Sequence, residues 1–358
     1  MLYSVILAGG SGTRLWPIST TKLPKQIKNI LSDRTLLEDT YQRLLKGFSA
    51  EDIFVVSSKH LKKEVKKQLS LSKQHIFVEP EPKGTAMAIG LAAIRLFHLD
   101  PEATIAIINS DAYVKETEKY LEVIKQAGQI AEKYPNQMVL IGIKPNYPET
   151  GYGYIEIEGS IKEAGVYQVK SFKEKPNLAT AKKYLQADRY FWNPAIFVFK
   201  AKQILLWYQK NLPDLYESLT QLQQSLKKSE EAYEQVLRQE YARVKNVSID
   251  YGLLEKMKEM LLLPADLTWL DIGNWRSLRD VRLLESQDDN VTNGKLISLD
   301  SHRNLLYSCD GKLIATIGVE DMILVETDKV IFLCPAEQAQ QIKELLKKVK
   351  DNNLEDYL

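Results

Sequence analysis

The N-terminal segment joins a short apolar run to a glycine-rich loop and to two cationic side chains. Residues 2–8 (Leu-Tyr-Ser-Val-Ile-Leu-Ala) are mostly apolar and predict a buried strand. The strand runs into a loop with three glycines, Gly9, Gly10 and Gly12. Glycine lets the backbone approach a bulky anion, and successive N–H groups can then point at phosphate oxygens. Because Arg14 offers a planar fork to phosphate and Lys25 a mobile point charge, the segment predicts a cradle for a nucleoside triphosphate.

The loop differs from the two common phosphate-binding sequences. A P-loop ends in Gly-Lys-Ser/Thr, whereas Gly12 is followed by Thr13 and Arg14. The dinucleotide-binding pattern needs a third glycine where this chain has Leu15. A plain connection between a strand and a helix is the alternative that the loop alone leaves open. Three cations within the same connection favour phosphate binding: Arg14, Lys22 and Lys25.

Length, charge and cysteine content limit the kind of protein. The 358 residues suffice for two domains, and the net charge of +1 gives no electrostatic reason to bind nucleic acid or an anionic membrane. Apolar runs such as 103–108 are far too short to span a bilayer, and the first run lacks the basic flank of a signal peptide. The two cysteines, Cys309 and Cys334, argue against a disulfide scaffold. We therefore expect a cytoplasmic protein with neither nucleic acid nor a membrane as partner.

Strand-like and helix-like segments alternate through the first half of the chain. We expect strands at 2–8, 53–57, 75–79, 104–109 and 137–143. We expect helices at 35–46, 60–70, 85–99 and 117–133. This alternation predicts an α/β fold with a parallel sheet covered on both faces. Ligands of such sheets bind beyond the carboxyl ends of the strands, where both the glycine loop and Asp111 are expected.

The second half has a more mixed pattern. Strands are expected at 151–158, 166–173 and 190–200, with a helix at 177–187 that Asn177 caps and long helical structure over 203–241. After about residue 284 the chain is rich in β-branched residues, with turns at Asn293-Gly294 and Asp310-Gly311. This composition predicts a small all-β module, followed by a terminal helix at 336–350.

The N-terminal motif resembles that of a known family. Residues 7–26 resemble the signature loop of the sugar-1-phosphate nucleotidyltransferases, and Trp16-Pro17 is similar to the mannose-1-phosphate guanylyltransferase branch. The resemblance covers nearly the whole chain. It implies a Rossmann-like nucleotidyltransferase domain over 1–284, with a mixed, mostly parallel sheet. It also implies a C-terminal domain over 285–358 that forms a short left-handed β-helix with a terminal helix, although no clean hexapeptide repeat is visible there.

The reaction of this family brings two polyanions together. Its nucleophile is a phosphate oxygen that is already ionised, so catalysis depends on positioning and electrostatics and needs no general base. Asp111 follows a buried strand, and Asp271 lies in a short aromatic-flanked strand before a glycine turn. Taken alone, Asp111 fits a turn or helix-capping residue equally well, and Asp271 fits an ordinary Asp-x-Gly turn better than a metal ligand. The resemblance implies that both bind Mg²⁺, with phosphate oxygens and water completing the shell.

The resemblance also assigns the other site residues. It implies catalytic roles for Arg14, Lys25, Asp111, Lys175 and Asp271. The nucleotide-binding residues it implies are Leu7, Ala8, Gly9, Gly10, Gly12, Thr13, Arg14, Lys25, Gly84, Thr85 and Asp111. The sugar-phosphate-binding residues it implies are Gly153, Glu174, Lys175 and Asn193. Asp250, within a motif that the family places near the site, is expected to be structural.

These assignments predict an enzyme that transfers GMP from GTP to α-D-mannose 1-phosphate, with GDP-mannose and pyrophosphate as products. A homodimer through the C-terminal domain is a further expectation. The chain departs from the family pattern at Lys83-Gly84, at Ala112 and at Pro194-Ala195, near the expected base and sugar sites. Two alternatives therefore stay open: the same chemistry with another sugar 1-phosphate or nucleotide, or an inactive relative that binds nucleotide sugars and regulates a partner.

Overall fold

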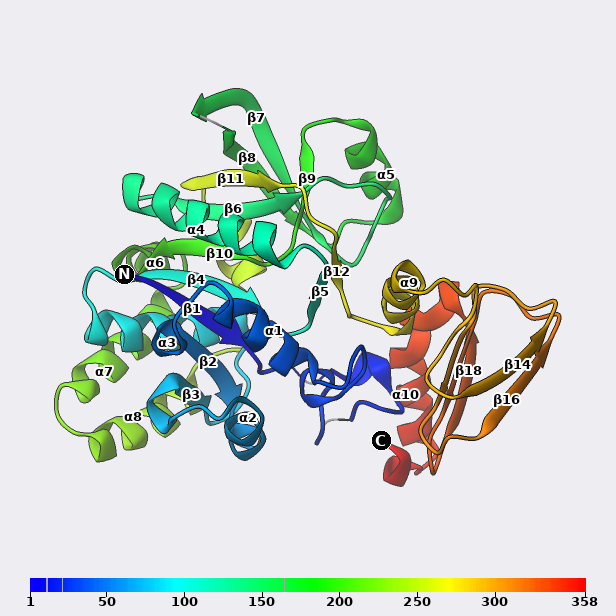
Figure 1. Cartoon of the computed structure of the whole chain (residues 1–358). Helices are drawn as coiled ribbons and strands as arrows, with labels where there is room; N and C mark the ends of the chain where they lie inside the picture. Colours follow the sequence, from blue (N-terminus) through cyan, green and yellow to red (C-terminus); the bar gives the residue numbers. More distant parts are fainter. Residues whose placement is uncertain (11, 21, 164) are drawn as a thin grey trace. The chain divides into compact units, whose positions relative to one another are not determined.

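The computed structural model describes residues 1–10, 12–20, 22–163 and 165–358 (Figure 1). Its contacts divide the chain into two compact units. The first unit comprises Met1–Gly9, Tyr41–Ser110 and Val114–Trp269, and the second comprises Gly10–Thr40, Asp111–Tyr113 and Leu270–Leu358. The chain thus passes between units inside the glycine loop, and α1 (Leu36–Leu45) also crosses the division. These two units are defined by contacts and differ from the two domains expected from the sequence, 1–284 and 285–358. The expected domain boundary stays a prediction.

The first unit contains a ten-stranded mixed sheet in the order β11-β8-β7-β9-β6-β10-β4-β1-β2-β3. Its strands are β1 (Leu2–Leu7), β2 (Ile53–Ser58), β3 (Ile76–Glu79), β4 (Thr104–Asn109), β6 (Met138–Ile143), β7 (Gly153–Glu163), β8 (Val166–Glu174), β9 (Tyr190–Asn193), β10 (Phe197–Lys200) and β11 (Met260–Ala265). Strands β3, β2, β1 and β4 are parallel, as the βαβ alternation predicted. Across the rest of the sheet neighbours are antiparallel, apart from the parallel pairing of β11 with β6.

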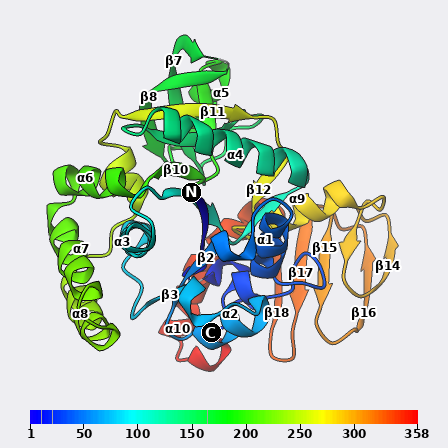
Figure 2. The same cartoon turned by 60° about the vertical axis from the view of Figure 1, so that its left-hand side comes forward.

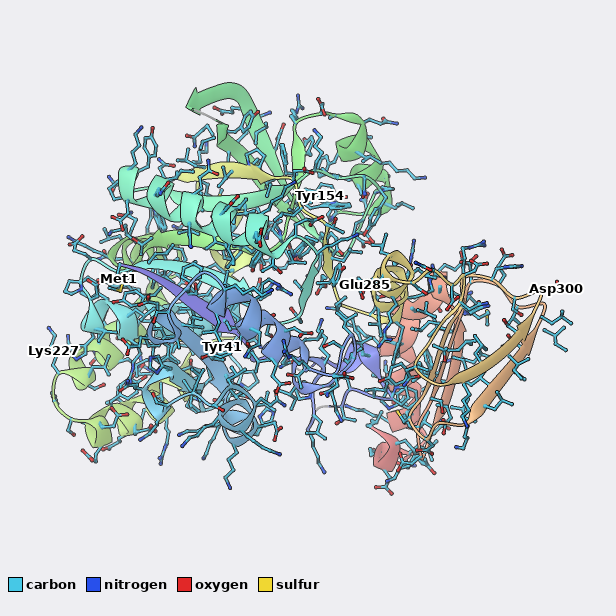
Figure 3. All side chains as sticks on the ribbon, in the orientation of Figure 1. Met1, Tyr41, Tyr154, Lys227, Glu285 and Asp300 are labelled. Carbon is cyan, nitrogen blue, oxygen red and sulfur yellow. The ribbon has the colours of Figure 1, made fainter. Side chains whose placement is uncertain are left out.

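The helices of the first unit pack on this sheet and on one another. They are α2 (Lys62–Leu69), α3 (Thr85–Leu99), α4 (Thr117–Lys133), α5 (Leu178–Gln186), α6 (Ala201–Asn211), α7 (Pro213–Leu226) and α8 (Glu230–Arg243). Helix α3 is apolar on nearly all sides because α6 and α7 cover it. At Gly90 a Cβ would lie 2.5 Å from Leu219 Cδ1 of α7, so the small residue permits this close packing. Figure 2 shows α7 and α8 lying side by side, and Figure 3 marks Lys227 in the turn between them.

Two expected elements are subdivided in the structure. The single strand expected at 190–200 was wrong: β9 ends at Asn193 and β10 begins at Phe197. Pro194 has no N–H to donate to a neighbouring strand, and Ala195 has a φ of 54°, which no strand residue adopts. The helical region 203–241 is confirmed as helical but consists of three helices.

The cap of α5 is confirmed, because the Asn177 side chain accepts a hydrogen bond from the Thr180 N–H.

The second unit contains the β-helix-like strands. These are β13 (Val291–Thr292), β14 (Lys295–Leu299), β15 (Leu305–Ser308), β16 (Leu313–Ile317), β17 (Met322–Glu326) and β18 (Ile331–Pro335), with α9 (Trp275–Glu285) before them and α10 (Ile342–Asp351) after them. Strand β14 pairs in parallel with β16, and β13, β15 and β17 pair in parallel with one another. Lys295 lies opposite Leu313 and Leu305 opposite Ile323, 18 residues apart in both pairs, whereas Val291 lies opposite Leu305, only 14 residues apart. The 18-residue spacing accommodates three hexapeptides per coil, even though the sequence shows no regular hexapeptide.

The segment after the glycine loop is part of the core of the second unit. Trp16 donates from its indole nitrogen to the Tyr357 carbonyl over 2.6 Å, and its own carbonyl accepts from the Trp275 indole over 2.8 Å. The Trp16 ring packs edge-on against Phe332 of β18. The Trp-Pro motif that suggested a particular branch of the family therefore has a structural role in this unit.

Candidate active site

Lys25 and two aspartates form the charged centre of the second unit. Its ammonium lies 2.9 Å from Asp111 Oδ2 and 3.6 Å from Asp271 Oδ1, and it donates to the Ile272 carbonyl over 2.6 Å. The Lys25 side chain is only 11% exposed. Burial alone would lower the pKa of Lys25, but the charges of Asp111 and Asp271 outweigh it and raise the pKa. Lys25 is therefore a firmly charged group that holds two carboxylates from distant parts of the chain.

Backbone pairing places the two aspartates beside each other. Strand β5 (Ala112–Val114) pairs with β12 (Trp269–Asp271), and the Ile272 N–H donates to the Asp111 carbonyl. At Gly273 a Cβ would lie 2.5 Å from Asp271 Oδ2 and 3.6 Å from Arg14 Nη1. The missing side chain at Gly273 thus leaves room for both the Asp271 carboxylate and the Arg14 guanidinium.

The loop holds Lys25 through its glycines. Gly12 has a φ of 60°, and a Cβ there would lie 2.6 Å from the backbone nitrogen of Lys25. The Gln26 amide donates to the Gly10 carbonyl over 2.8 Å, and the Ser19 hydroxyl donates to the Gly12 carbonyl. Thr13 begins the short 3₁₀ turn Thr13–Leu15 that carries Arg14. The loop is folded back onto the segment that follows it.

The residues of this centre suit Mg²⁺. Asp111 and Asp271 offer hard carboxylate oxygens and are 26% and 32% exposed, so both remain accessible to a ligand. Mg²⁺ is commonly held by one or two carboxylates together with substrate phosphates and water. Within the described part of the chain no group of three or more His, Cys, Asp or Glu side chains could hold a metal, so a tight all-protein cage is not formed.

The first unit carries the start of the loop and a buried acid that was not predicted. Ala8 donates from its N–H to the Val56 carbonyl and accepts from the Ser57 hydroxyl, which fixes the end of β1 after Leu7. A Cβ at Gly9 would lie 3.2 Å from Glu79 Oε2. Burial raises the pKa of Glu79 to about 7, against the hydrogen bond that it accepts from the Tyr241 hydroxyl.

Gly84 and Thr85 stand at the start of α3 and are anchored to residues 247–249. Gly84 has a φ of 84°, and a Cβ there would lie 2.3 Å from the Val247 carbonyl oxygen. The Thr85 hydroxyl accepts a hydrogen bond from the Ile249 N–H, and the Ala86 N–H donates to Val247. Only glycine fits against Val247 at this position of the chain.

The residues expected to bind the sugar phosphate are neighbours across three strands. Gly153 of β7 lies opposite Glu174 of β8 on one side and opposite Asn193 of β9 on the other. A Cβ at Gly153 would lie 2.6 Å from Glu174 Oε2. The side-chain oxygen of Asn193 accepts from the Ala195 N–H, so its amide N–H groups are the donors that it can offer to a hydroxyl. The structure thus brings all three together.

Lys175 and Asp250 extend this group. Lys175, with a φ of 45°, places its ammonium 2.7 Å from Glu174 Oε1. Burial and, after it, the charge of Glu174 raise the pKa of Asp250 to about 7, while the charge of Lys175 opposes them. Asp250 therefore lies close enough to Glu174 and Lys175 for their charges to shift its pKa. Nothing in the local sequence indicates that the pKa of Asp250 is raised.

An aromatic row accompanies the same strands and was not predicted. The Trp192 ring contacts Tyr147 and Tyr152 edge-on, and Tyr152 contacts Trp269. Tyr154 of β7 lies among the strands of this unit, as its label in Figure 3 shows. Because Trp192 and Trp269 are buried, these ring contacts serve to pack the strands together.

The fold is that of an α/β protein with a β-helix-like region, and its charged centre is of a kind that suits phosphorylated ligands. Residues 3–287 match the nucleotidyl transferase family. The chain belongs to this family. Residues 294–349 match the domain described as mannose-phosphate isomerase/GMP-like β-helix, which agrees with the parallel coils of the second unit.

Known relatives resemble the chain over its full length. Mannose-1-phosphate guanylyltransferase 2 of Escherichia coli O157:H7 is 31% identical over 369 residues, which cover 100% of this chain and 75% of the relative. Mannose-1-phosphate guanylyltransferase of Salmonella montevideo is 31% identical over 365 residues, 100% of this chain and 76% of the relative. A crystal structure described as mannose-1-phosphate geranyltransferase from Thermus thermophilus superposes with a TM-score of 0.85 at 28% identity, covering 98% and 99% of the two chains.

Four of the five expected catalytic residues belong to the second unit: Arg14, Lys25, Asp111 and Asp271. The fifth, Lys175, belongs to the first unit together with the other sugar-phosphate residues. Their roles stay predictions. Among the described residues, no helix combines the length and apolar character that crossing a membrane requires.

Proposed function

We propose that this enzyme transfers GMP from GTP to α-D-mannose 1-phosphate, releasing pyrophosphate and forming GDP-mannose in the cytoplasm. The observation that carries the proposal is the cluster of Lys25 with Asp111 and Asp271, together with Arg14. This cluster occurs in a chain whose full-length relatives are named mannose-1-phosphate guanylyltransferases. Intact charged residues of this kind disfavour an inactive regulatory relative.

The sugar phosphate oxygen attacks the α-phosphorus in line, and pyrophosphate leaves. Arg14 binds the triphosphate with its planar guanidinium, and Lys25 neutralises the charge that collects on the leaving pyrophosphate. Lys175 holds the attacking phosphate, so that positioning and electrostatics supply the catalysis. Asp111 and Asp271 would hold Mg²⁺, which supplies further charge neutralisation at the phosphates.

The sugar is held by the residues around β7. Glu174 and the amide of Asn193 exchange hydrogen bonds with sugar hydroxyls, and Gly153 lets the backbone approach the ring. Support comes from the direct opposition of these three residues across the strands. Tyr152 is half-buried and packs edge-on against the buried Trp192, so Tyr152 is the aromatic residue of this row that can give the sugar an apolar neighbour.

The test is a substrate screen with purified protein. Pyrophosphate release is measured with Mg²⁺ for GTP, ATP, UTP and dTTP, each combined with mannose, glucose and galactose 1-phosphates. We expect turnover with GTP and mannose 1-phosphate, and none with the Asp111→Asn variant as the matched control. Activity with UTP or dTTP alone would contradict the base assignment. Activity of the variant equal to that of the wild type would contradict the role of Asp111.

A second candidate is the same chemistry on another sugar 1-phosphate or nucleotide. The observation that favours it is the close packing of Gly84 against Val247, at a point where the family pattern has a larger residue. The same screen separates the two candidates, because the preferred pair of substrates is its direct readout.

We propose further that two copies of the chain associate through the C-terminal domain. Strands β14 and β16 pair only with each other among the described strands. One face of this pair exposes a row of large apolar side chains, Ile297, Leu299, Leu313 and Ile317. Such a row on one copy is complementary to the same row on a second copy related by a twofold axis.

A further inference from the structure

The Lys25 ammonium stands at the point where oxygens of the charged centre converge. Two carboxylate oxygens, Asp111 Oδ2 and Asp271 Oδ1, and the Ile272 carbonyl face this one nitrogen at 2.9, 3.6 and 2.6 Å. An ammonium has three N–H donors and no acceptor, so a setting of three oxygens suits it well. A convergence of hard oxygens is also what a small divalent cation requires.

The charges of this centre are balanced without any metal. The two carboxylates contribute two negative charges, and Lys25 and the nearby Arg14 contribute two positive ones. A divalent cation approaching the carboxylates would meet the Lys25 ammonium at about the distance of a hydrogen bond. Because the Lys25 side chain is buried, the positive charges of its ammonium and of a divalent cation at this distance repel each other strongly. Lys25 and a divalent cation therefore compete for the same carboxylates.

We infer that Lys25 is the resident counter-ion of the Asp111–Asp271 pair, and that the pair takes up a divalent cation only together with a polyphosphate. Phosphate oxygens give the Lys25 ammonium a new partner and give the cation its remaining ligands. The inference rests on the proposed function only in that the site binds a polyphosphate. The choice of base and sugar does not enter it.

The test measures how tightly Mn²⁺ binds to the protein in the absence of nucleotide. Electron paramagnetic resonance reports the concentration of free Mn²⁺. Wild type should bind Mn²⁺ weakly, and Lys25→Met should bind it at least about tenfold more tightly because a like charge beside the cation is removed. Lys25→Arg keeps the charge and should stay weak. Lys28→Met is the matched control, because it removes one positive charge from the same segment and should behave like wild type. Adding Asp271→Asn to Lys25→Met should abolish the gain.

A second measurement uses inorganic pyrophosphate as the polyphosphate. In wild type, pyrophosphate should tighten Mn²⁺ binding to the protein at least about tenfold, once binding of Mn²⁺ by free pyrophosphate is accounted for. In Lys25→Met the same addition should give a smaller increase, since there is no ammonium to displace. Far-UV circular dichroism and a melting curve first establish that each variant is folded.

Two results would overturn the inference. One is a folded Lys25→Met variant that binds Mn²⁺ no more tightly than wild type does. The other, which needs no variant, is wild-type protein that binds Mn²⁺ as tightly without pyrophosphate as with it. Neither result bears on the choice of GTP and mannose 1-phosphate, which the substrate screen decides separately.

Discussion

Gly12 lies directly against the backbone of Lys25: a Cβ at position 12 would be 2.6 Å from the Lys25 nitrogen. The residue also has a φ of 60°, a conformation that side-chain-bearing residues rarely adopt. The close approach gives the glycine loop a structural role, in addition to the phosphate binding that we propose for its N–H groups. It also sets the position of the lysine that pairs with Asp111 and Asp271.

The first prediction concerns this contact. Gly12→Ala should lower the free energy of unfolding by about 1–3 kcal/mol, because the new methyl group is strained and overlaps the Lys25 backbone. Chemical denaturation measures the loss. Gly10→Ala is the control, since no described atom lies within 4 Å of a Cβ there. Equal stability of the two variants would mean that the loop can relax around position 12.

The second prediction separates the two lysines that flank Glu174, Lys173 and Lys175. Lys175→Ala should raise KM for the sugar 1-phosphate at least about tenfold and change KM for GTP by less than about twofold, because we propose that Lys175 holds the attacking phosphate. Lys173→Ala is the control, as Lys173 is 54% exposed and pairs with Glu255 at 3.1 Å. If the loss fell on GTP, the roles given to Lys175 and Lys25 would be wrong.

The local elements could be predicted from the sequence, because periodicity and caps are short-range signals. The βαβ alternation predicted the parallel half of the sheet, and Asn177 predicted the start of α5. Pairings between distant segments could not be predicted in the same way. The Lys25 ammonium and the Ile272 carbonyl are 247 residues apart, and only the folded chain brings them together. The resemblance to a family pointed to these residues, whereas their spacing alone did not.

The raised pKa values of two acids, the buried Glu79 and the half-buried Asp250, could not be predicted from the sequence either. Glu79 and Asp250 look like ordinary acids in the sequence, since each stands beside polar or turn-forming residues. Their pKa values of about 7 arise first from burial, which depends on how α8, β3 and β8 pack and has no local signature. The signal that could have drawn attention to Glu79 is its place at the end of a predicted strand, the position where this fold binds its ligands.

The third prediction follows from Glu79. Its folded pKa of about 7 lies above the usual value of 4.5, so the unfolded chain loses this proton first as the pH rises. The stability that the protonated group contributes is present below pH 4.5 and is lost as the pH passes through 7. Glu79→Gln stays neutral and can still accept from Tyr241. It should therefore be more stable than wild type at pH 8, by up to about 3 kcal/mol, and equal to it near pH 4.5.

Urea denaturation of both proteins at several pH values between 4.5 and 8 checks this. Glu81→Gln is the control, because the Glu81 side chain is 51% exposed and pairs with Lys83 at 3.3 Å. A difference between Glu79→Gln and wild type that does not change with pH would show that the Glu79 carboxylate is ionised throughout.

The fourth prediction tests association through β14 and β16. The double variant Ile297→Asp/Ile317→Asp should be monomeric under conditions where wild type is dimeric, because two charges would be buried in the apolar face. Light scattering after size-exclusion chromatography measures the mass. Ser298→Asp adds a charge to the other face of β14 and should leave the dimer intact. A monomeric wild type at high concentration would reject the association.

The fifth prediction concerns the sugar subsite at Gly153. A Cβ there would lie 2.6 Å from Glu174 Oε2 and 2.8 Å from Phe172 Cζ, so Gly153→Ala must push the Glu174 carboxylate away. We expect kcat/KM for the sugar 1-phosphate to fall at least about tenfold, since a buried hydrogen-bonding group would be misplaced. Gly151→Ala is the matched control. Its nearest atom, Glu149 Oε1 at 3.0 Å, ends a flexible side chain that can move aside. Steady-state kinetics at saturating GTP measure kcat/KM for the sugar 1-phosphate in both variants. Equal values for Gly153→Ala and Gly151→Ala would contradict a role of Glu174 in the sugar subsite.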